Sequence, residues 1–367
     1  MSAEKDYWLA FSHIKGVGAV RFRKLISYFG SLEQAWQASE ARLLTAGLSE
    51  KVVAQISSGR KTITPEGLRA ELERKKINFL TWEDPEYPEY LRQIDQPPPV
   101  IYFIGEITAA DGNAAAIVGT RAATTYGRQL TKDVAAFLAG NGVTVVSGLA
   151  RGVDAIAHQA ALDIGGRTIA VLGSGVDVIY PPEHRQLAEH ISHSGAVLSD
   201  YPPGTKPDGI NFPPRNRIIS GLSRVTIVIE AGEKSGALIT AKFAVEQGRE
   251  VFAVPGSVLS AMSKGTNNLL AEGATPLTNP ADVLKIFQMN ARPVNTAQTA
   301  AQPDPEAKRI LSLLGTDSMH IDELCQRLDI SIDKLTAQLA LMELEGLVQR
   351  THGMEYQAVK SWDAGRI

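Results

Sequence analysis

The stretch Val145–Gly175, VVSGLARGVDAIAHQAALDIGGRTIAVLGSG, decides the fold. Val143–Val146 and Thr168–Leu172 are short apolar runs flanked by glycines, which is typical of buried parallel strands. Between them, Asp154–Asp163 carries apolar residues at helical spacing and is followed by a Gly-Gly pair, which predicts a helix stop. The segment is therefore one strand–helix–strand unit. Its loops leave the carboxyl ends of strands, where open α/β sheets build ligand sites.

The same alternation continues on both sides of this unit. Further predicted strands are Ala115–Val118, Ala196–Ser199, Arg224–Ile229 and Glu250–Val254. Further predicted helices are Gly127–Ala139, Leu187–Ser192, Asn216–Gly221 and Gly236–Gln247. Strands that alternate with helices of about ten residues indicate an α/β domain with a parallel, Rossmann-like sheet. We expect this domain to span residues 81–288.

Residues 1–80 read as short helices and predict a helical domain of the SAM or helix-hairpin-helix kind. The run Ile14-Lys-Gly-Val-Gly18 has the form of a helix-hairpin-helix turn, and Arg21, Arg23 and Lys24 follow it. Such a turn can offer backbone N–H groups to a phosphate. The more common role of so short a motif is a packing turn, and both interpretations stay open.

Residues 289–304 are rich in Ala, Thr, Gln, Asn and Pro and predict a linker. Residues 305–360 then show three helical segments and a hairpin turning at His352-Gly353, which indicates a winged helix. The third helical segment carries Asp333, Glu343 and Glu345 against a single cation, Lys334. Because a DNA-reading helix needs cations near the phosphates, we favour protein contact or weak DNA binding for this domain.

The composition excludes several classes of protein. The chain has 367 residues, a net charge of −3 and one cysteine, Cys325, so no internal disulfide framework exists and a reducing cytoplasm fits. No apolar run approaches the roughly 18 residues of a membrane span, and the N-terminus lacks a signal-peptide profile. We expect a cytoplasmic protein without membrane contact. Nucleic-acid binding would have to rest on a local basic patch.

Five loops at predicted strand ends share a composition of Gly, Ser, Thr and Arg. They begin at Gly119, Ser147, Gly173, Phe212 and Glu230, and the third contains Gly173 and Ser174. Glycine lets the backbone approach an anion, hydroxyls and N–H groups donate hydrogen bonds, and arginine matches phosphate. Loops of this kind at one sheet edge predict a phosphate site. Neither a P-loop nor a complete dinucleotide fingerprint occurs, and no cluster has metal-ligand spacing, so we expect no cofactor and no metal.

The segment Pro202–Arg224 is strongly basic. It carries Lys206, Arg215, Arg217 and Arg224 against one acid, Asp208, with Phe212 beside the arginines. A cationic track with an aromatic face is how sequence-independent single-strand binding is built. The alternative is that Arg215 and Arg217 tether the helix Ile218–Leu222 within the fold, and we expect this role for one of the pair.

Several titratable residues could act as acids or bases, namely Asp154, His158, Asp177, His184 and Glu230. Asp154 and His158 lie four residues apart on one helical face. A structural role is the favoured alternative, with Asp154 capping the start of the helix and His158 a satisfied buried imidazole.

Long motifs of this chain resemble the DNA-processing protein A (DprA/Smf) family over about residues 100–280. The motifs are SGLARGVDAIAHQAAL, TIAVLGSGVDVIYPPEHRQL, NFPPRNRIISGLS, EAGEKSGALITAKFAVEQGREVFAVPG and KGTNNLLAEGA. The resemblance implies a non-catalytic, bacterial cytoplasmic protein of natural transformation, which binds incoming single-stranded DNA, protects it and helps to load the recombinase RecA. It also implies a homodimer formed through the Rossmann-like domains.

The resemblance further implies which residues contact DNA and which form the dimer. The DNA-binding residues it implies are Gly119, Thr120, Arg121, Ser147, Gly148, Arg151, Gly152, Phe212, Arg215, Asn216 and Arg217. The composition arguments add Gly173, Ser174 and Lys206. Thr120 replaces the serine usual in the family. The residues implied at the dimer surface are Leu269, Leu270 and Leu277.

Two alternative functions stay open at this stage. Related Rossmann-like folds cleave nucleoside monophosphates to base and ribose phosphate, but the pattern of those enzymes is missing at Glu230-Ala-Gly-Glu-Lys-Ser-Gly-Ala. The other alternative is a pocket that senses a free nucleotide, with the winged helix as effector.

Overall fold

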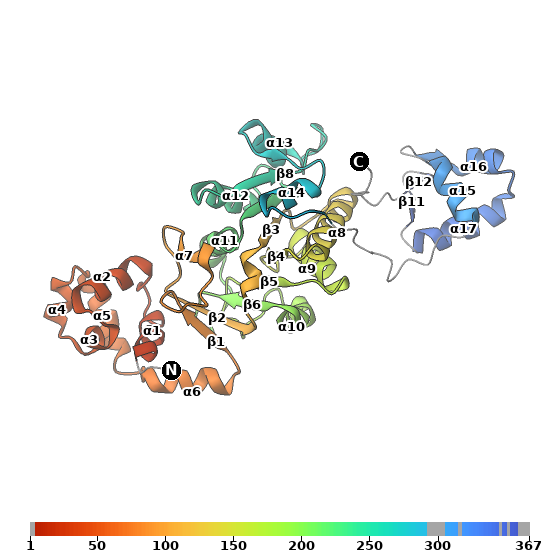
Figure 1. Cartoon of the computed structure of the whole chain (residues 1–367). Helices are drawn as coiled ribbons and strands as arrows, with labels where there is room; N and C mark the ends of the chain where they lie inside the picture. Colours follow the sequence, from red (N-terminus) through yellow and green to blue (C-terminus); the bar gives the residue numbers. More distant parts are fainter. Residues whose placement is uncertain (1–3, 292–304, 315–317, 345–346, 351–352, 359–367) are drawn as a thin grey trace. The chain divides into compact units, whose positions relative to one another are not determined.

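The structure is a computed structural model that describes residues 4–291, 305–314, 318–344, 347–350 and 353–358 (Figure 1). The chain forms two compact units, Met1–Arg292 and Pro293–Ile367. Most of the predicted linker and His352 of the predicted hairpin turn lie outside the described residues.

The first unit is built on a nine-stranded sheet in the order β1-β2-β6-β5-β4-β3-β7-β8-β9. Neighbouring strands are parallel except for the pairs β1–β2 and β2–β6, which are antiparallel. The strands are β1 (Asn78–Thr81), β2 (Val100–Gly105), β3 (Ala114–Val118), β4 (Thr144–Ser147), β5 (Thr168–Val171), β6 (Ala196–Ser199), β7 (Val225–Val228), β8 (Glu250–Ala253) and β9 (Thr275–Pro276). The predicted α/β fold with a largely parallel sheet is confirmed.

Helices cover both faces of the sheet (Figure 1). The helices between β3 and β6 pack on one another, and those between β6 and β8 form a second packed pair. The first group is α8 (Thr125–Gly140), α9 (Val153–Asp163) and α10 (Arg185–Ser194), and the second is α11 (Phe212–Gly221) and α12 (Gly236–Glu246). Because such crossovers are right-handed, the two directions of winding put the two groups on opposite faces. The direction reverses between β3 and β7, and this switch point opens a crevice at the strands' carboxyl ends.

The central strands are apolar because they are covered on both sides. All five residues of Ala114–Val118 are buried, and so are Val145 and Val146 of β4. Alternation of inward and outward residues is absent from such strands, as expected for a parallel sheet between two helix layers. The bounds of the six predicted strands match those of β3 to β8 to within one or two residues.

Six short helices precede the sheet: α1 (Glu4–Ser12), α2 (Ala19–Phe29), α3 (Leu32–Gln37), α4 (Glu40–Thr45), α5 (Glu50–Gly59) and α6 (Pro65–Arg74). Their core includes Trp8 and Phe22, whose ring centroids lie 5.4 Å apart, and is continuous with Tyr102 of β2. The predicted boundary at residue 80 falls inside β1. The helical part and the sheet therefore belong to one compact unit.

The Ile14–Gly18 turn joins α1 to α2 and has the packing role that was one of its two interpretations. Ile14 and Val17 are buried, and Gly16 adopts a positive φ of +87° that favours glycine. A DNA contact at this turn stays a prediction.

The second unit has the predicted winged-helix elements. Its helices are α15 (Pro305–Leu314), α16 (Ile321–Leu328) and α17 (Ile332–Leu344). Its sheet has the order β10-β12-β11 and is formed by β10 (Met319–His320), β12 (Glu355–Ala358) and β11 (Val348–Arg350). The strand β10 was not predicted from the sequence. Ile310, Leu324 and Leu335 belong to a core within this unit.

Among the described residues, no helix combines the length and the apolar character that crossing a membrane requires.

We predict that a chain ending at Ala291 folds by itself. Each unit buries its own apolar cluster, so the cut removes no residue from the core of the first unit. Its thermal unfolding should stay cooperative, with a midpoint within about 4 °C of the corresponding transition of the full chain, or roughly 1 kcal/mol. Circular dichroism and calorimetry test this. A broad transition together with binding of a hydrophobic dye would contradict it.

Candidate nucleic-acid interface

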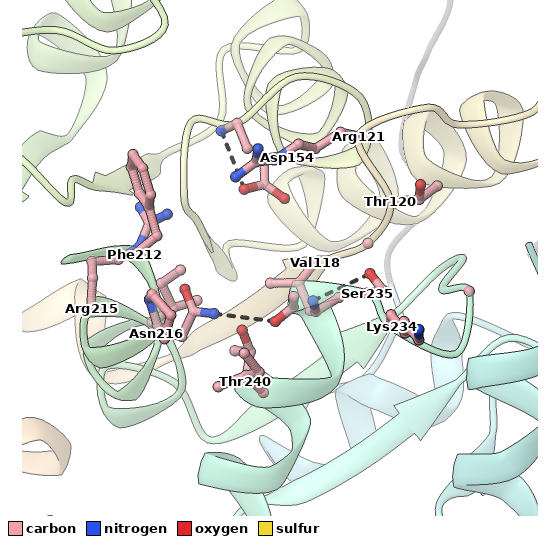
Figure 2. A pocket seen from close by; sticks show the side chains of 18 of the residues that line it. Val118, Thr120, Arg121, Asp154, Phe212, Arg215, Asn216, Lys234, Ser235 and Thr240 are labelled. Carbon is pink, nitrogen blue, oxygen red and sulfur yellow. Dashed lines mark hydrogen bonds between the residues drawn. The ribbon is translucent and has the colours of Figure 1, made fainter. Parts of the chain in front are cut away.

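A cavity of about 880 Å³ lies at the switch point of the sheet, between the carboxyl ends of β3 and β7 (Figure 2). Most of its wall comes from the loop that follows β3, the first turns of α11, and the loop after β7 with the start of α12. Single residues of other segments, among them Tyr180 and Met262, complete it. The volume is in the range of pockets that hold small ligands. The sequence predicted a ligand site at the carboxyl ends of the strands, and the structure has a cavity there that is large enough for a small ligand.

The loop after β3 is anchored on both sides and presents one free cation. The Thr120 N–H donates to the carbonyl oxygen of Glu230 at 2.7 Å, and the Thr120 carbonyl accepts from the Val153 N–H at 3.2 Å. These bonds hold the backbone, while the side chain of Arg121 is exposed and lines the cavity. Among the described residues, no carboxylate forms an ion pair with Arg121. Its charge is available to a ligand.

The helix α11 begins at Phe212, four residues earlier than the sequence predicted. Pro213 and Pro214 occupy its first turn, where a fixed φ and a missing N–H are tolerated. The interpretation of Phe212–Arg217 as a loop is therefore wrong. The helix brings Phe212, Arg215 and Asn216 to the cavity wall together.

Two aromatic rings form one wall at the mouth of the cavity. The ring centroids of Phe212 and Tyr180 lie 5.7 Å apart at an angle of 33°. The guanidinium groups of Arg121 and Arg215 each lie 5.9 Å from the centroid of Phe212. A planar apolar surface next to cations suits a nucleobase joined to a phosphate.

Arg215 is a buried structural cation. Its Nη1 donates to the carbonyl oxygens of Gly148, at 2.8 Å, and Val171, and so ties α11 to the ends of β4 and β5. A Cβ on Gly148 would lie 2.8 Å from both the Arg215 guanidinium and the Asp154 carboxylate, so only glycine fits there. Burial lowers the pKa of Arg215 to about 10, against the opposing charge of Asp154. The group remains charged at neutral pH.

Arg217 and Arg224 are not at the cavity. Arg217 points to the Asp200 carboxylate, 2.8 Å away, and does not line the cavity wall. Arg224 precedes β7 at the opposite edge of the sheet and donates to the Ile286 carbonyl at 2.6 Å. Both side chains are used within the fold, which separates Arg224 from the predicted basic track, while the DNA contact of Arg217 stays a prediction. The alternative of a tether applies to both arginines of the Arg215–Arg217 pair.

The remaining predicted residues fall into two groups. Gly119, Thr120, Arg121, Phe212, Arg215 and Asn216 line the main cavity, and Gly148 and Arg151 line a small adjoining recess. Six predicted residues line neither, namely Ser147, Gly152, Gly173, Ser174, Lys206 and Arg217.

Most of these six residues act within the fold. The buried Ser147 hydroxyl donates to the Ile117 carbonyl at 2.6 Å, and that of Ser174 donates to the Val178 carbonyl at 2.7 Å. Gly173 packs against the Phe212 ring, and Gly152 has a φ of +76° with no room for a Cβ beside the Thr120 carbonyl. The side chains of Ser147 and Ser174 are therefore buried and engaged, and a direct DNA contact through these side chains is wrong. Lys206 is exposed and precedes Pro207, which lines the cavity, and the DNA contact of Lys206 stays a prediction.

The candidate acids and bases are engaged in the fold. The Asp154 carboxylate accepts from the N–H groups of Gly148, at 3.2 Å, and Ala150, and burial raises its pKa while Arg215 opposes that shift. The Glu230 carboxylate accepts from the Thr124 N–H at 2.9 Å and its hydroxyl at 2.5 Å, at the start of α8. Asp177 pairs with Lys75.

His158 is buried and neutral. Its Nδ1 lies 2.7 Å from the Thr168 hydroxyl, and burial lowers its pKa to about 3. Both side chains are thus used within the fold, but two details of the predicted structural roles are wrong. Asp154 accepts from N–H groups of the loop before α9 and does not cap that helix, whose N-cap is Gly152. The buried Nε2 of His158 has no hydrogen-bond partner among the described residues.

The sequence did not single out five further residues of the cavity wall: Tyr180, Lys234, Ser235, Thr240 and Met262. Lys234 and Ser235 lie in the loop identified by its composition, and Ser235 caps α12 by accepting from the Ala237 N–H at 3.3 Å. A serine before an apolar helical run is a recognisable cap signal. Thr240 and Tyr180 reach the cavity only through the tertiary fold.

The structure contradicts the assignment of Leu277 to a dimer surface. Its side chain is only 1% exposed within the single chain, and its N–H donates to the Ala253 carbonyl beside β8. Leu269 and Leu270 on α13 (Lys264–Ala271) are half-buried, and their role at an interface stays a prediction.

No group of three or more His, Cys, Asp or Glu side chains in the described part of the chain is arranged to hold a metal ion.

We predict that His158 makes the protein less stable in acid. The unfolded histidine titrates near 6.5 and the folded one near 3, so the unfolded state binds more protons between these pH values. Stability should therefore fall as the pH drops below about 6.5, by up to ~1.4 kcal/mol per pH unit. In a His158→Gln variant this slope should be smaller in urea unfolding between pH 7 and 4. Parallel curves for the variant and the wild type would contradict this.

The fold and the cavity define the class: a doubly wound α/β protein with a cavity at its switch point that Arg121 and Lys234 line, joined to a winged helix. Residues 78–288 match the family model of DNA recombination-mediator protein A, and residues 294–354 match that of the DprA winged helix domain. The chain belongs to the DNA recombination-mediator protein A family.

Similar proteins agree with this membership. The chain is 39% identical to "Protein Smf" of Synechocystis, covering 97% of this chain and 99% of the relative, and 38% identical to "DNA processing protein DprA" of Bacillus subtilis, covering 68% and 87%. The solved structure of DprA from Streptococcus pneumoniae superimposes with a TM-score of 0.68 at 35% identity, covering 78% of this chain and 98% of that one. A structure from Helicobacter pylori, whose title describes a single-stranded DNA binding mode, has a TM-score of 0.53 at 32% identity, covering 58% and 96%. A role in DNA processing and recombination follows.

Proposed function

We propose that this protein binds single-stranded DNA in the switch-point cavity and acts as a recombination mediator. The observation that carries the proposal is that Arg121 and Lys234, both without a carboxylate partner among the described residues, line the same cavity as the ring of Phe212. Cations attract the phosphate backbone, and an aromatic face stacks with a base of any sequence. The Helicobacter pylori relative, described by its title as a single-strand binder, supports the same choice.

The aromatic wall favours single strands over duplex. A base can stack on Phe212 and Tyr180 only after it has left its neighbours, and in a duplex that costs a few kcal/mol. The cavity also lies in a crevice, whereas duplex readout commonly places a helix in the major groove. We expect the preference for single-stranded DNA to come from both features.

We propose that the winged-helix unit is not the main DNA-binding site and that its principal contact is with another protein. The exposed side chains of α17 include Asp333 and Glu343 against Lys334. An acidic recognition helix repels phosphates, which leaves protein contact as the better-supported role.

We further propose that the protein delivers the strand to a RecA-type recombinase in the bacterial cytoplasm without catalysing a reaction. Membership of a recombination-mediator family supports delivery, and the structural engagement of Asp154, His158 and Glu230 leaves these candidates without a catalytic task. Assembly of recombinase on DNA coated with single-strand binding protein tests delivery. Incubation with nucleoside monophosphates, with no free base expected, tests the absence of hydrolysis.

We predict that Arg121→Ala weakens binding of a fluorescent oligothymidine about tenfold or more at low salt. Loss of one phosphate contact should also reduce the slope of log affinity against log salt by about 0.7. Anisotropy titrations with single-stranded and duplex DNA of the same length measure both quantities. Lys242→Ala is the matched control, because Lys242 is exposed on α12 and does not line the cavity. Unchanged affinity and slope in a folded Arg121→Ala protein would contradict the location of the site.

We propose a homodimer through α13 and the loop that precedes it. In addition to Leu269 and Leu270, this loop presents Val258 at 82% and Leu259 at 93% exposure. Two adjacent exposed apolar side chains are unusual on a free surface and fit a protein interface.

We predict that Leu259→Glu converts the dimer to a monomer. The side chain is almost fully exposed in the single chain, so the substitution does not disturb the core, and a charge buried at an interface is costly. Sedimentation velocity measures the mass, and circular dichroism checks the fold. Val245→Glu is the control, since Val245 is 65% exposed on α12. Equal dimer stability in wild type and Leu259→Glu would refute this interface.

A further inference from the structure

The end of the cavity opposite the aromatic wall contains a second group of polar atoms. Figure 2 shows Lys234, Ser235 and Thr240 at the start of α12, across the cavity from Phe212. The helix α12 has 11 residues, and its first N–H groups face the crevice that β3 and β7 leave open. This end is distinct from the stacking platform of the proposed function.

Thr240 is the unexplained member of this group. The residue is only 1% exposed, lines the cavity and points its hydroxyl toward it. Within the described residues, no hydrogen-bond partner lies near the Thr240 hydroxyl, although a threonine in a helix commonly donates to the carbonyl four residues earlier. That carbonyl, of Gly236, accepts instead from Asn216 Nδ2 at 3.2 Å. The oxygen is not sealed from solvent but borders the open space of the cavity, so its donor and acceptor are available to a ligand or a water.

The charges around this hydroxyl favour an anion. The positive end of the α12 dipole and Lys234 lie on the same side of the cavity, and Lys234 has no ion-pair partner in the described part of the chain. The Gly236 N–H has no protein acceptor there either. Two carboxylates are near: that of Glu233 pairs with Lys264 at 3.5 Å, and that of Asp154 is buried against Arg215. Neither neutralises Lys234.

We propose that the start of α12 is a subsite for a phosphate monoester, carried at the 5′ end of a DNA strand or by a free nucleoside monophosphate. A monoester carries more negative charge than a backbone diester and offers three acceptor oxygens. The donors would be Lys234, the Thr240 hydroxyl and the Gly236 N–H. The cavity of about 880 Å³ is large enough to hold a terminal nucleotide with its base at Phe212 and its phosphate at α12. The subsite deepens the proposed function and rests on it for the strand-end source.

The test compares 5′-phosphorylated and 5′-hydroxyl oligothymidine of six nucleotides on the full chain. A short strand is used so that its end contributes to most binding events. We expect the phosphorylated strand to bind about three to ten times more tightly, or ~0.7 to 1.4 kcal/mol. Lys234→Ala and Thr240→Val should each reduce this ratio toward one, whereas Thr240→Ser, which keeps the hydroxyl, and Lys242→Ala should retain it.

Competition with thymidine 5′-monophosphate and with thymidine identifies the source of the phosphate. Displacement by the monophosphate but not by thymidine, lost in Thr240→Val, supports a free nucleotide as ligand. A preference for the phosphorylated strand without such displacement supports a strand end. Equal binding of both strands together with no displacement overturns the inference, and so does a preference that persists in Lys234→Ala and Thr240→Val.

The failure of the proposed function has a different signature. In that case neither strand binds, and the subsite is then decided by calorimetric titration of thymidine 5′-monophosphate alone. Heat of binding in the wild type that Thr240→Val loses supports the subsite, and no heat overturns it.

Discussion

The buried guanidinium of Arg215 holds the cavity together. By donating to the carbonyls of Gly148 and Val171, it joins the start of α11 to the ends of β4 and β5. Asp154 compensates its charge from the start of α9 and in turn accepts from the N–H groups of the loop after β4. Removing one member of such a buried pair leaves an uncompensated charge and costs about 3 to 5 kcal/mol. The position of Phe212, three residues before Arg215, depends on this arrangement.

The basic residues of the sequence thus divide into two groups by their partners. Arg215 donates to backbone carbonyls and Arg217 pairs with Asp200. Both arginines stabilise the helix that carries the ring of Phe212. Arg121 and Lys234 have no acidic partner among the described residues and line the cavity from opposite loops. A net charge of −3 is compatible with polyanion binding because only the local arrangement of the unpaired cations matters.

The sequence was sufficient for the architecture and for the location of the cavity. Runs such as Ala114–Val118 and Thr168–Val171 are apolar throughout, and this pattern has few interpretations other than a covered parallel strand. The roles of individual arginines were beyond sequence reasoning, because Arg215 and Arg217 differ only in what the fold places opposite them. The same holds for Leu277, whose burial depends on its position next to β8, and for Thr240, which reaches the cavity only after α12 packs on α11.

The position of the bound strand is measured most directly by photo-crosslinking the full chain to an oligothymidine that carries 4-thiothymidine. Mass spectrometry then identifies the linked peptides. The account predicts crosslinks to the peptides that contain Tyr180 and Phe212, which form the stacking wall of the cavity. Crosslinks confined to the winged-helix unit, with none in residues 119–240, would contradict the claim that the switch-point cavity holds the strand.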